Sequence, residues 1–519
     1  MISPLTYILG WPLVAAAVIL LIPRNYRFVI RVVALVATFA SMLLAIKMFA
    51  GFQAGLPGYQ FENVPVPWVQ SSGIHYHVGV DGINIGLVLM AAIVAFAATA
   101  VAWEITDRVK EFYFLLMVMA GGILGAFASL DLFFFYFFHE LALIPTFLMI
   151  GLWGRGENRN YATFQITLYL SIGALLALIG LVALYFQLPV NGRSFDLADL
   201  TQYFAGHTMS MAAQNFIFPL LLFGFGILVS LWPFHTWAPL GYGSAPTATA
   251  MLHAGVLKKF GLYGLLRVAL PFMPDAAQSW MHIVAFLCLG NILHCGWVAM
   301  RQRDLNLLIG NSSVAHMGFC FLGLASLSLI GVTGAVLVMI AHGFLAALTF
   351  ALSGYLYSQT KTLDMDRMGG LLRQLPFIGA SLVMAMMAGC GLPGFANFTG
   401  EATVLFGAWK LSPFVTVLAV WGALLIGSVY MLRAIRGILH GPSVPEWAGV
   451  RDASSYWRKF PYALLLGCLL LFGFAPRLLT EKIKPSAEPL IRMAHGERLA
   501  AGAKARRARI QPVAPRQVK

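Results

Sequence analysis

The feature of this sequence that most limits its possible folds is a succession of apolar stretches. Each stretch has about the 20 residues that a helix needs to cross the hydrocarbon core of a bilayer. Fourteen stretches fit, beginning near Leu5, Phe28, Val80, Glu111, Leu130, Thr163, Asn215, Thr247, Ser279, Asp304, Ser328, Pro376, Ser412 and Phe460. The ten-residue alternation typical of a membrane β-barrel is absent. The sequence therefore predicts an all-α polytopic membrane protein with about fourteen transmembrane helices.

The composition agrees with a chain whose surface lies mostly against lipid or apolar protein. Of its 519 residues, 60% are hydrophobic and 10% are charged, whereas about 25% are charged in a typical soluble protein. The loops between the apolar stretches are mostly too short to hold a soluble domain. The first stretch leads directly into further ones, which is not the pattern of a cleaved signal peptide.

Basic residues are unevenly distributed along the chain, whose formal net charge is +14. Seven basic and no acidic residues occur from Arg498 to Lys519, which predicts a solvated, disordered tail rather than a nucleic-acid-binding region. Most other basic residues follow odd-numbered stretches, and the positive-inside rule places those loops in the cytoplasm. The basic residues assigned to even-numbered loops are Lys47, Arg193, Arg267 and Lys410. Both termini are then expected in the periplasm, which puts the basic tail on the side that the rule disfavours.

Five cysteines lie within apolar stretches, and none forms a Cys-x-x-Cys pair: Cys288, Cys295, Cys320, Cys390 and Cys468. This placement predicts packing residues and argues against a disulfide framework, an iron–sulfur cluster or a zinc site. No glycine-rich nucleotide loop opens a helix after a strand. We therefore expect no cofactor and no metal in this chain.

Two of the apolar stretches contain helix-breaking sequences. These are Trp232-Pro233 with Trp237-Ala238-Pro239 in the seventh stretch, and Gly391-Leu392-Pro393-Gly394 in the twelfth. Proline removes a backbone donor and clashes with the preceding turn, so each helix should unwind locally. One such break is more often a simple kink. Two at corresponding positions favour an ion pathway, because unwound backbone at membrane depth must line a polar cavity or be covered by protein.

Ionisable side chains within the apolar stretches are the candidate functional residues, since each costs roughly 2.5–3.5 kcal/mol to insert at the centre of a membrane helix. Carboxylate, amine and imidazole groups can together form a proton relay, because burial and neighbouring charges shift their pKa values past one another. The set interpreted as a relay is Glu140, Lys259, His316, His342 and Glu401. For Lys258 we favour a structural ion pair or a snorkelling side chain. Both interpretations stay open for His139, His253 and His294.

The motifs around these residues follow one another in the order of a known family over nearly the whole chain. They are HVGVDGI at residues 77–83, HELALIP at 139–145, PFHTWAP at 233–239, APT at 245–247, AGVLKK at 254–259, YGLLR at 263–267, SSVAHMG at 312–318, DRMGGL at 366–371 and GLPGFANFTGE at 391–401. In these motifs the chain resembles the M-subunit family of bacterial NADH-quinone oxidoreductase (respiratory complex I) and, more broadly, the antiporter-like membrane subunits.

This resemblance implies two inverted repeats of five helices and a hydrophilic axis at the membrane midplane. It also implies proton translocation driven by quinone reduction elsewhere in the complex. Glu140 would be the acid of the first half-channel, Glu401 the exit-side group, and Lys259, His316 and His342 the central connection, with Lys258 and His253 as weaker candidates. The implied regions are residues 1–110 (three N-terminal helices), 111–275 (first repeat), 276–440 (second repeat), 441–480 (last transmembrane helix) and 481–519 (basic tail).

The resemblance also implies a setting in the bacterial inner membrane, with lipid and the L-, N- and K-type membrane-arm subunits as partners and no nucleic acid. The complex would hold FMN, iron–sulfur clusters and quinone, while this chain would be a non-redox translocase subunit with no activity alone. Two alternatives stay open: a subunit of a multisubunit cation/proton antiporter or ion-coupled transporter, and the membrane arm of a hydrogenase-type complex. The L-type paralogue is disfavoured because its long amphipathic C-terminal helix is not apparent after Arg477.

One departure from the family pattern concerns the first half-channel. The family usually has a lysine nine residues before the tryptophan of the His-x-Trp-x-Pro motif, where this chain has Leu228. A lysine common in the sixth span is replaced by Gln165. Glu140 therefore lacks its usual partner. Either another route serves it, through His139, Lys258 or water, or the first half-channel is impaired.

Overall fold

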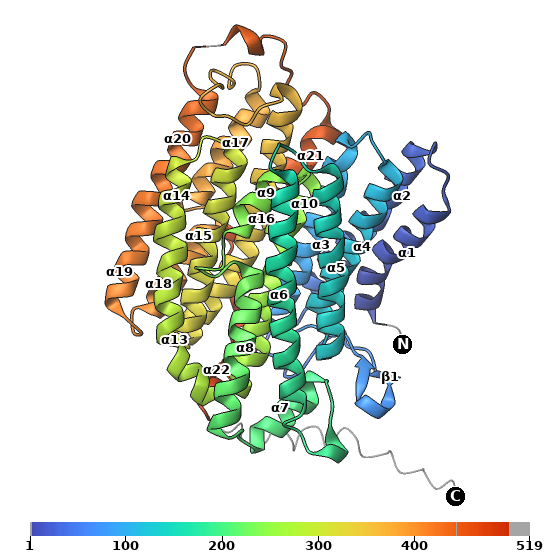
Figure 1. Cartoon of the computed structure of the whole chain (residues 1–519), viewed down its shortest axis with the longest axis vertical. Coiled ribbons are helices and arrows are strands. Elements are labelled where there is room, and N and C mark those ends of the chain that lie inside the picture. Colours follow the sequence, from blue (N-terminus) through green and yellow to red (C-terminus); the bar gives the residue numbers. More distant parts are fainter. Residues whose placement is uncertain (1–2, 443, 498–519) are drawn as a thin grey trace, which may run out of the picture.

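The computed structural model describes residues 3–442 and 444–497 and consists of an upright bundle of helices joined by loops at its two ends (Figure 1). The α-helices are α1 (Pro4–Leu21), α2 (Arg27–Gly51), α3 (Asn84–Val101), α4 (Val109–Ala128), α5 (Leu132–Trp153), α6 (Arg159–Tyr185), α7 (Leu197–Gly206), α8 (Met211–Val229), α9 (Trp237–Ser244), α10 (Thr247–Leu252), α11 (Lys259–Gly264), α12 (Leu270–Phe272), α13 (Pro274–Leu289), α14 (Cys295–Arg301), α15 (Leu305–Ala325), α16 (Leu329–Thr360), α17 (Pro376–Gly389), α18 (Ala396–Ala408), α19 (Pro413–Trp421), α20 (Ser428–Leu439), α21 (Tyr456–Phe474) and α22 (Arg477–Ala494). Four π-helical turns interrupt them: η4 (His253–Leu257), η5 (Leu265–Ala269), η6 (Gly290–His294) and η7 (Gly422–Gly427).

Within the described residues, 12 helical segments are long and apolar enough to cross a membrane. The predicted fold class, an all-α polytopic membrane protein, is confirmed. Of the fourteen predicted spans, the eighth and the twelfth are not among these segments, because residues 247–272 and 376–408 are divided into shorter helices. The total of fourteen spans, the two inverted repeats and the region boundaries drawn from them stay predictions.

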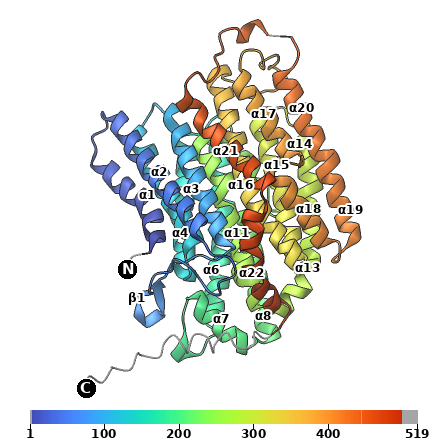
Figure 2. The same cartoon turned by 180° about the vertical axis from the view of Figure 1, so that it is seen from behind.

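The helices that carry the central candidate residues are the most buried ones. The apolar windows of α15 and α16 are 94% and 100% buried inside the protein, whereas those of α1, α2 and α6 are each 39% buried. Both ribbon views place α16 near the middle of the bundle (Figures 1 and 2). Because lipid does not reach these two helices, their polar side chains can contact only protein or internal water.

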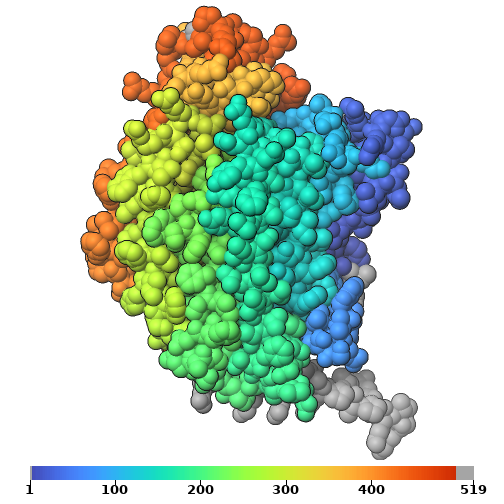
Figure 3. All heavy atoms as spheres, viewed as in Figure 1, coloured from blue at the N-terminus to red at the C-terminus, as the bar shows by residue number. Residues whose placement is uncertain are grey.

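The outer helices turn large apolar side chains away from the bundle. On α6, Phe164, Ile172 and Leu175 are exposed, and α6 together with α8 and α13 covers much of the face in Figure 3. An exposed apolar surface of this kind is typical of contact with lipid or with another membrane subunit.

A small extramembrane region covers one end of the bundle. Strands β1 (Val66–Val69) and β2 (Ile74–Tyr76) form an antiparallel hairpin, and the chain continues into His77, which hydrogen-bonds through Nδ1 to Asp196 at 2.5 Å. Asp196 also caps α7 by accepting from the backbone N–H of Ala198. Burial opposes a charge on His77, but the hydrogen bonds to Asp196 and Glu62 outweigh it and raise the pKa of His77 to about 9. The imidazolium–carboxylate pair therefore ties the hairpin to α7 at neutral pH.

The first part of the predicted basic tail, residues 481–494, is helical, because α22 continues to Ala494. This amphipathic helix packs against α16 and α12, and the hydroxyl of Ser486 accepts a hydrogen bond from the backbone N–H of Gly82. A Cβ at Gly82 would lie 1.7 Å from the carbonyl oxygen of Lys482, so the glycine permits this contact. Two prolines and a high charge hid the helical periodicity in the sequence. The segment from Arg498 to Lys519 lies outside the described residues.

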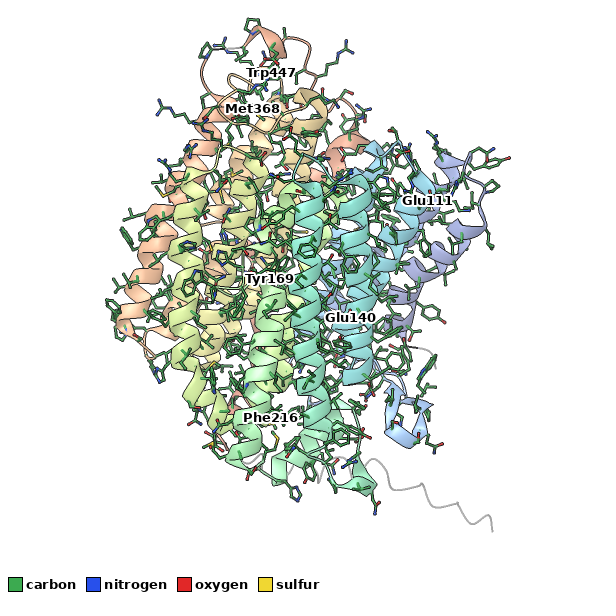
Figure 4. All side chains as sticks on the ribbon, viewed as in Figure 1. Glu111, Glu140, Tyr169, Phe216, Met368 and Trp447 are labelled. Carbon is green, nitrogen blue, oxygen red and sulfur yellow. The ribbon has the colours of Figure 1, made fainter. Side chains whose placement is uncertain are left out.

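The sequence pattern assigns Arg267 to an even-numbered loop, and this assignment is wrong. Arg267 lies within η5, is buried, and forms an ion pair with Asp81 at 2.5 Å. Asp81 stands just before α3, so the pair fixes the start of α3 against η5. Glu111, Met368 and Trp447 mark the opposite end of the bundle from the hairpin (Figure 4). The orientation of these two ends in the membrane stays a prediction.

Candidate functional site

The first predicted helix break is present, and a side chain from another helix satisfies its backbone. Helix α8 ends at Val229, and Ser230 adopts a left-handed backbone conformation with φ of +73°. The amide of Asn291 donates to the carbonyl of Ser230 at 2.8 Å and accepts from the backbone N–H of Trp232 at 2.8 Å. Backbone groups freed at membrane depth need such partners, so Asn291 explains how the break is tolerated.

The second predicted break separates α17 from α18. Gly391 and Gly394 have φ angles of +68° and +102°, which L-residues with a side chain rarely adopt. A Cβ at Gly391 would also lie 3.0 Å from the Oε2 atom of Glu401. The break therefore brings unwound backbone close to one of the predicted relay residues.

Four of the five predicted relay residues form one connected row. The Nζ atom of Lys259 lies 2.8 Å from Nδ1 of His342 and donates to the carbonyl of Ala254 at 2.6 Å. The rings of His342 and His316 have centroids 5.4 Å apart. Nε2 of His316 lies 3.5 Å from Oε1 of Glu401. All four residues are at most 6% exposed, so the row runs through the interior of the bundle.

The Glu401 end of this row adjoins a small cavity. His316, Glu401 and Tyr430 line it together with small residues of η7, and its volume of about 10 Å³ is roughly what one water molecule needs. The Nδ1 atom of His316 donates to the carbonyl of Ser312 at 2.7 Å, which leaves Nε2 facing Glu401. Oε1 of Glu401 has no hydrogen-bond partner among the described residues. A water in the cavity would complete the polar contacts.

Lys258 and His253 are buried beside the row but are not members of it. The Lys258 ammonium donates to the hydroxyl of Ser313 at 3.2 Å and lies over the Tyr242 ring, 5.4 Å from its centroid. His253 packs against the rings of Trp237 and Tyr242, and its Nδ1 has no partner in the described part of the chain. Lys258 therefore does not snorkel to a span end, since its ammonium is enclosed by protein.

Glu140 is separate from the four-residue row. Its side chain is 29% exposed, and its ion-pair partner within the described residues is Nδ1 of His139 at 3.4 Å. His139 is buried and stacks on Phe260, with ring centroids 3.9 Å apart. Figure 4 places Glu140 at mid-height of the bundle on α5. The predicted set of five is thus divided into one residue at the surface of this chain and four in its interior.

The positions where the family usually has lysines hold a buried apolar residue and a neutral polar group. Leu228 is 2% exposed. The side-chain amide of Gln165 donates to the hydroxyl of Thr236 at 3.1 Å, and that hydroxyl lies 3.3 Å from the hydroxyl of Tyr169. Neither position supplies a cation to Glu140, as the sequence predicts.

Two features of the site were missed from the sequence. The π-helical turns η4 and η5 flank α11, which begins at Lys259, and η7 lines the cavity at Glu401. Such turns are rare in proteins, and those that occur are often at functional sites. They have no sequence signature. The second feature is the approach of Cys295 to His235 and His294, which bears on the prediction of no metal and which residue spacing could not reveal.

The fold and the site together define a polytopic membrane protein with a row of ionisable side chains enclosed at the centre of its helix bundle. Comparison with known proteins identifies the family. The family model described as "NADH:quinone oxidoreductase/Mrp antiporter, TM" matches residues 129–427, more than half of the chain. The chain therefore belongs to the NADH:quinone oxidoreductase/Mrp antiporter family of transmembrane subunits.

Individual relatives point in the same direction. NADH-quinone oxidoreductase subunit M of Rhodobacter capsulatus is 34% identical over 94% of this chain and 96% of its own length. A chain of respiratory complex I from Thermus thermophilus superposes with a TM-score of 0.85 at 28% identity, covering 95% of this chain and 99% of that one. A chain of the Mrp complex from Dietzia sp. DQ12-45-1b has a TM-score of 0.81 at 17% identity, with coverages of 95% and 99%, and this likeness shows the fold alone.

Proposed function

We propose that this chain is the M-type membrane subunit of an NADH-quinone oxidoreductase and that it moves protons along the row from Lys259 to Glu401. The single observation that carries the proposal is the contact sequence Lys259–His342–His316–Glu401, enclosed where lipid does not reach. Quinone reduction elsewhere in the complex would supply the energy. The similarity to subunit M proteins over nearly the full length of the chain supports this assignment.

The contacts at the two ends of the row place proton donors beside acceptors. Lys259 is a donor and Nδ1 of His342 an acceptor in their hydrogen bond, so a proton moves from the ammonium to the imidazole without large motion. His316 donates from Nδ1 to Ser312, which leaves Nε2 to exchange a proton with Glu401. An imidazole suits this intermediate position because one ring nitrogen can accept a proton while the other donates one. The cavity beside Glu401 would hold the water that carries the proton onward.

The first half-channel would work with an imidazole in place of the usual lysine. Among the described residues, His139 is the ion-pair partner placed beside Glu140, and its stacking on Phe260 holds the ring in place. Phe260 follows Lys259 directly in α11, so a shift of α11 would affect both the Glu140–His139 pair and the central row. This arrangement favours a modified first half-channel over an impaired one.

The remaining properties follow from the same assignment. The chain would bind no redox cofactor, act as a non-redox translocase subunit and show no activity alone, while the complex would hold FMN, iron–sulfur clusters and quinone. Its partners would be lipid and L-, N- and K-type subunits. Its helices would form two inverted repeats in the bacterial inner membrane, with both termini in the periplasm.

The test is NADH-driven proton uptake by inverted membrane vesicles that carry the intact complex. Glu401→Gln and His316→Gln should each lower proton uptake at least about tenfold, because each removes a proton-transfer group. Glu446→Gln is the matched control, since its carboxylate is exposed in a loop ion pair. NADH oxidation with a soluble acceptor and the amount of this subunit in the purified complex should stay unchanged in all variants, which shows that the complex assembles. Unchanged proton uptake in both relay variants would contradict the proposal, and Na⁺-dependent proton flux without NADH would favour the antiporter alternative.

A further inference from the structure

A second cluster of ligand-type side chains lies beside the first helix break and is not part of the proton row. His235 in the break approaches His294 at the end of η6 and Cys295 at the start of α14, with one possible ligand atom from each residue within 4.8 Å of the other two. His235 and Cys295 are buried, while His294 is exposed at the outer surface of the bundle. The two imidazole rings meet edge to face with centroids 5.6 Å apart.

Hydrogen bonds join the first helix break to η6, and they hold the three side chains near one another. Asn291 in η6 bonds to the backbone on both sides of Leu231 within the break. Gly290 leaves room for the indole of Trp232, because a Cβ there would lie 2.5 Å from that ring. His294 and Cys295 are consecutive, at the end of η6 and the start of α14, so the contact of Asn291 with the break keeps both of them near it.

One nitrogen of the cluster lacks any partner in the described residues. Nδ1 of His235 is buried and makes no hydrogen bond, and the side chain is 7% exposed. A buried polar atom in this state destabilises the fold, and binding a ligand would remove that cost. This nitrogen is therefore not engaged by the protein and is available to a ligand.

Two imidazole nitrogens and one thiolate are donors that Zn²⁺ prefers, and three protein ligands leave one of its four positions open. We propose that His235, His294 and Cys295 bind a Zn²⁺ ion, with the open position on the exposed side of His294. Zinc–nitrogen and zinc–sulfur bonds of about 2.0 and 2.3 Å require ligand atoms roughly 3.5 Å apart, so atoms that now lie within 4.8 Å of one another would have to move closer on binding. On binding, the Cys295 thiol gives its proton to a water or hydroxide that leaves the incoming hydrated ion, and its sulfur forms the bond to zinc.

The position of the cluster links it to a buried charge. Lys258 is buried in the same part of the bundle as His235 and Cys295. A divalent ion at the cluster would therefore oppose the positive charge of Lys258. The site is separate from the proposed proton row, and its test does not depend on proton transfer.

The test measures zinc in the intact purified complex after removal of loosely held metal with a chelator and titration with Zn²⁺ alone. Wild type should retain about one more Zn²⁺ per complex than Cys295→Ser, and zinc-edge X-ray absorption should show a sulfur neighbour at about 2.3 Å that the variant lacks. His294→Gln should weaken the same binding at least about tenfold. Cys288→Ser and His282→Gln are matched controls, because both residues lie on α13 in the same helical span and outside the cluster.

Equal zinc content and equal absorption spectra in wild type and Cys295→Ser would overturn the proposal. If Cys295→Ser prevents assembly, His294→Gln decides the question, because its side chain lies at the protein surface and its replacement leaves the core intact. Unchanged zinc affinity in that variant would equally refute the site.

Discussion

Replacing Asp196 with asparagine should remove a pH-dependent stabilisation of the region that joins the hairpin to α7. Burial disfavours a charged His77, but its bonds to Asp196 and Glu62 raise the pKa of His77 from 6.5 to about 9. This difference corresponds to about 3 kcal/mol, since one pKa step equals about 1.4 kcal/mol. Because the pKa is raised on folding, the stabilisation is fully present below pH 6.5 and is lost as the pH rises through about 9. Asparagine keeps the oxygen that caps α7 but not the charge.

The measurement is hydrogen–deuterium exchange of peptides covering residues 66–80 and 190–206 in the intact complex, corrected for intrinsic exchange rates. In wild type the local opening equilibrium should increase by roughly 100-fold between pH 6 and pH 10, which is what about 3 kcal/mol predicts. In Asp196→Asn this dependence should largely disappear and protection at pH 6 should fall. Asp199→Asn is the control, because this carboxylate is exposed on the same helix. Equal pH dependence in wild type and Asp196→Asn would refute the reasoning.

Two further substitutions test packing inside the bundle. Gly82→Ala should destabilise the docking of α22 by more than the roughly 1–3 kcal/mol that overpacking usually costs, because the new methyl group would meet the backbone carbonyl of Lys482. Thermal inactivation of the complex measures this loss. Gly467→Ala is the control, since the surroundings of Gly467 are open. Leu228→Lys should reduce the amount of assembled complex in membranes, because a buried ammonium costs roughly 2.5–3.5 kcal/mol, whereas Leu228→Met should assemble normally. If Leu228→Lys assembles normally and takes up protons faster than wild type, the reasoning is wrong, because the first half-channel would then work better with a lysine at this position.

Much of the fold could be predicted because a membrane imposes its requirements on consecutive residues. A span must be apolar over about 20 residues, so helix positions and fold class follow from the order of amino acids. The sequence predicts both helix breaks for a similar reason, because Pro233 and Gly391 change the conformation of the backbone at their own positions. The sequence did not predict features that depend on contacts between residues far apart in the chain. A buried arginine needs a partner for its charge, and the partner of Arg267 is Asp81, which lies far away in the chain. The local sequence does not show this partner and therefore predicts a loop position for Arg267.

The candidate site divides in the same way. The sequence by itself determined which ionisable groups are present within apolar spans, because each is expensive there and stands out against its neighbours. Only the tertiary structure decided which of them touch. Lys259 meets His342 across 83 positions of the chain, and Glu140 is excluded from the row although it belongs to the same set. Contacts of this kind depend on the rotation and packing of whole helices, which no local pattern of residues specifies.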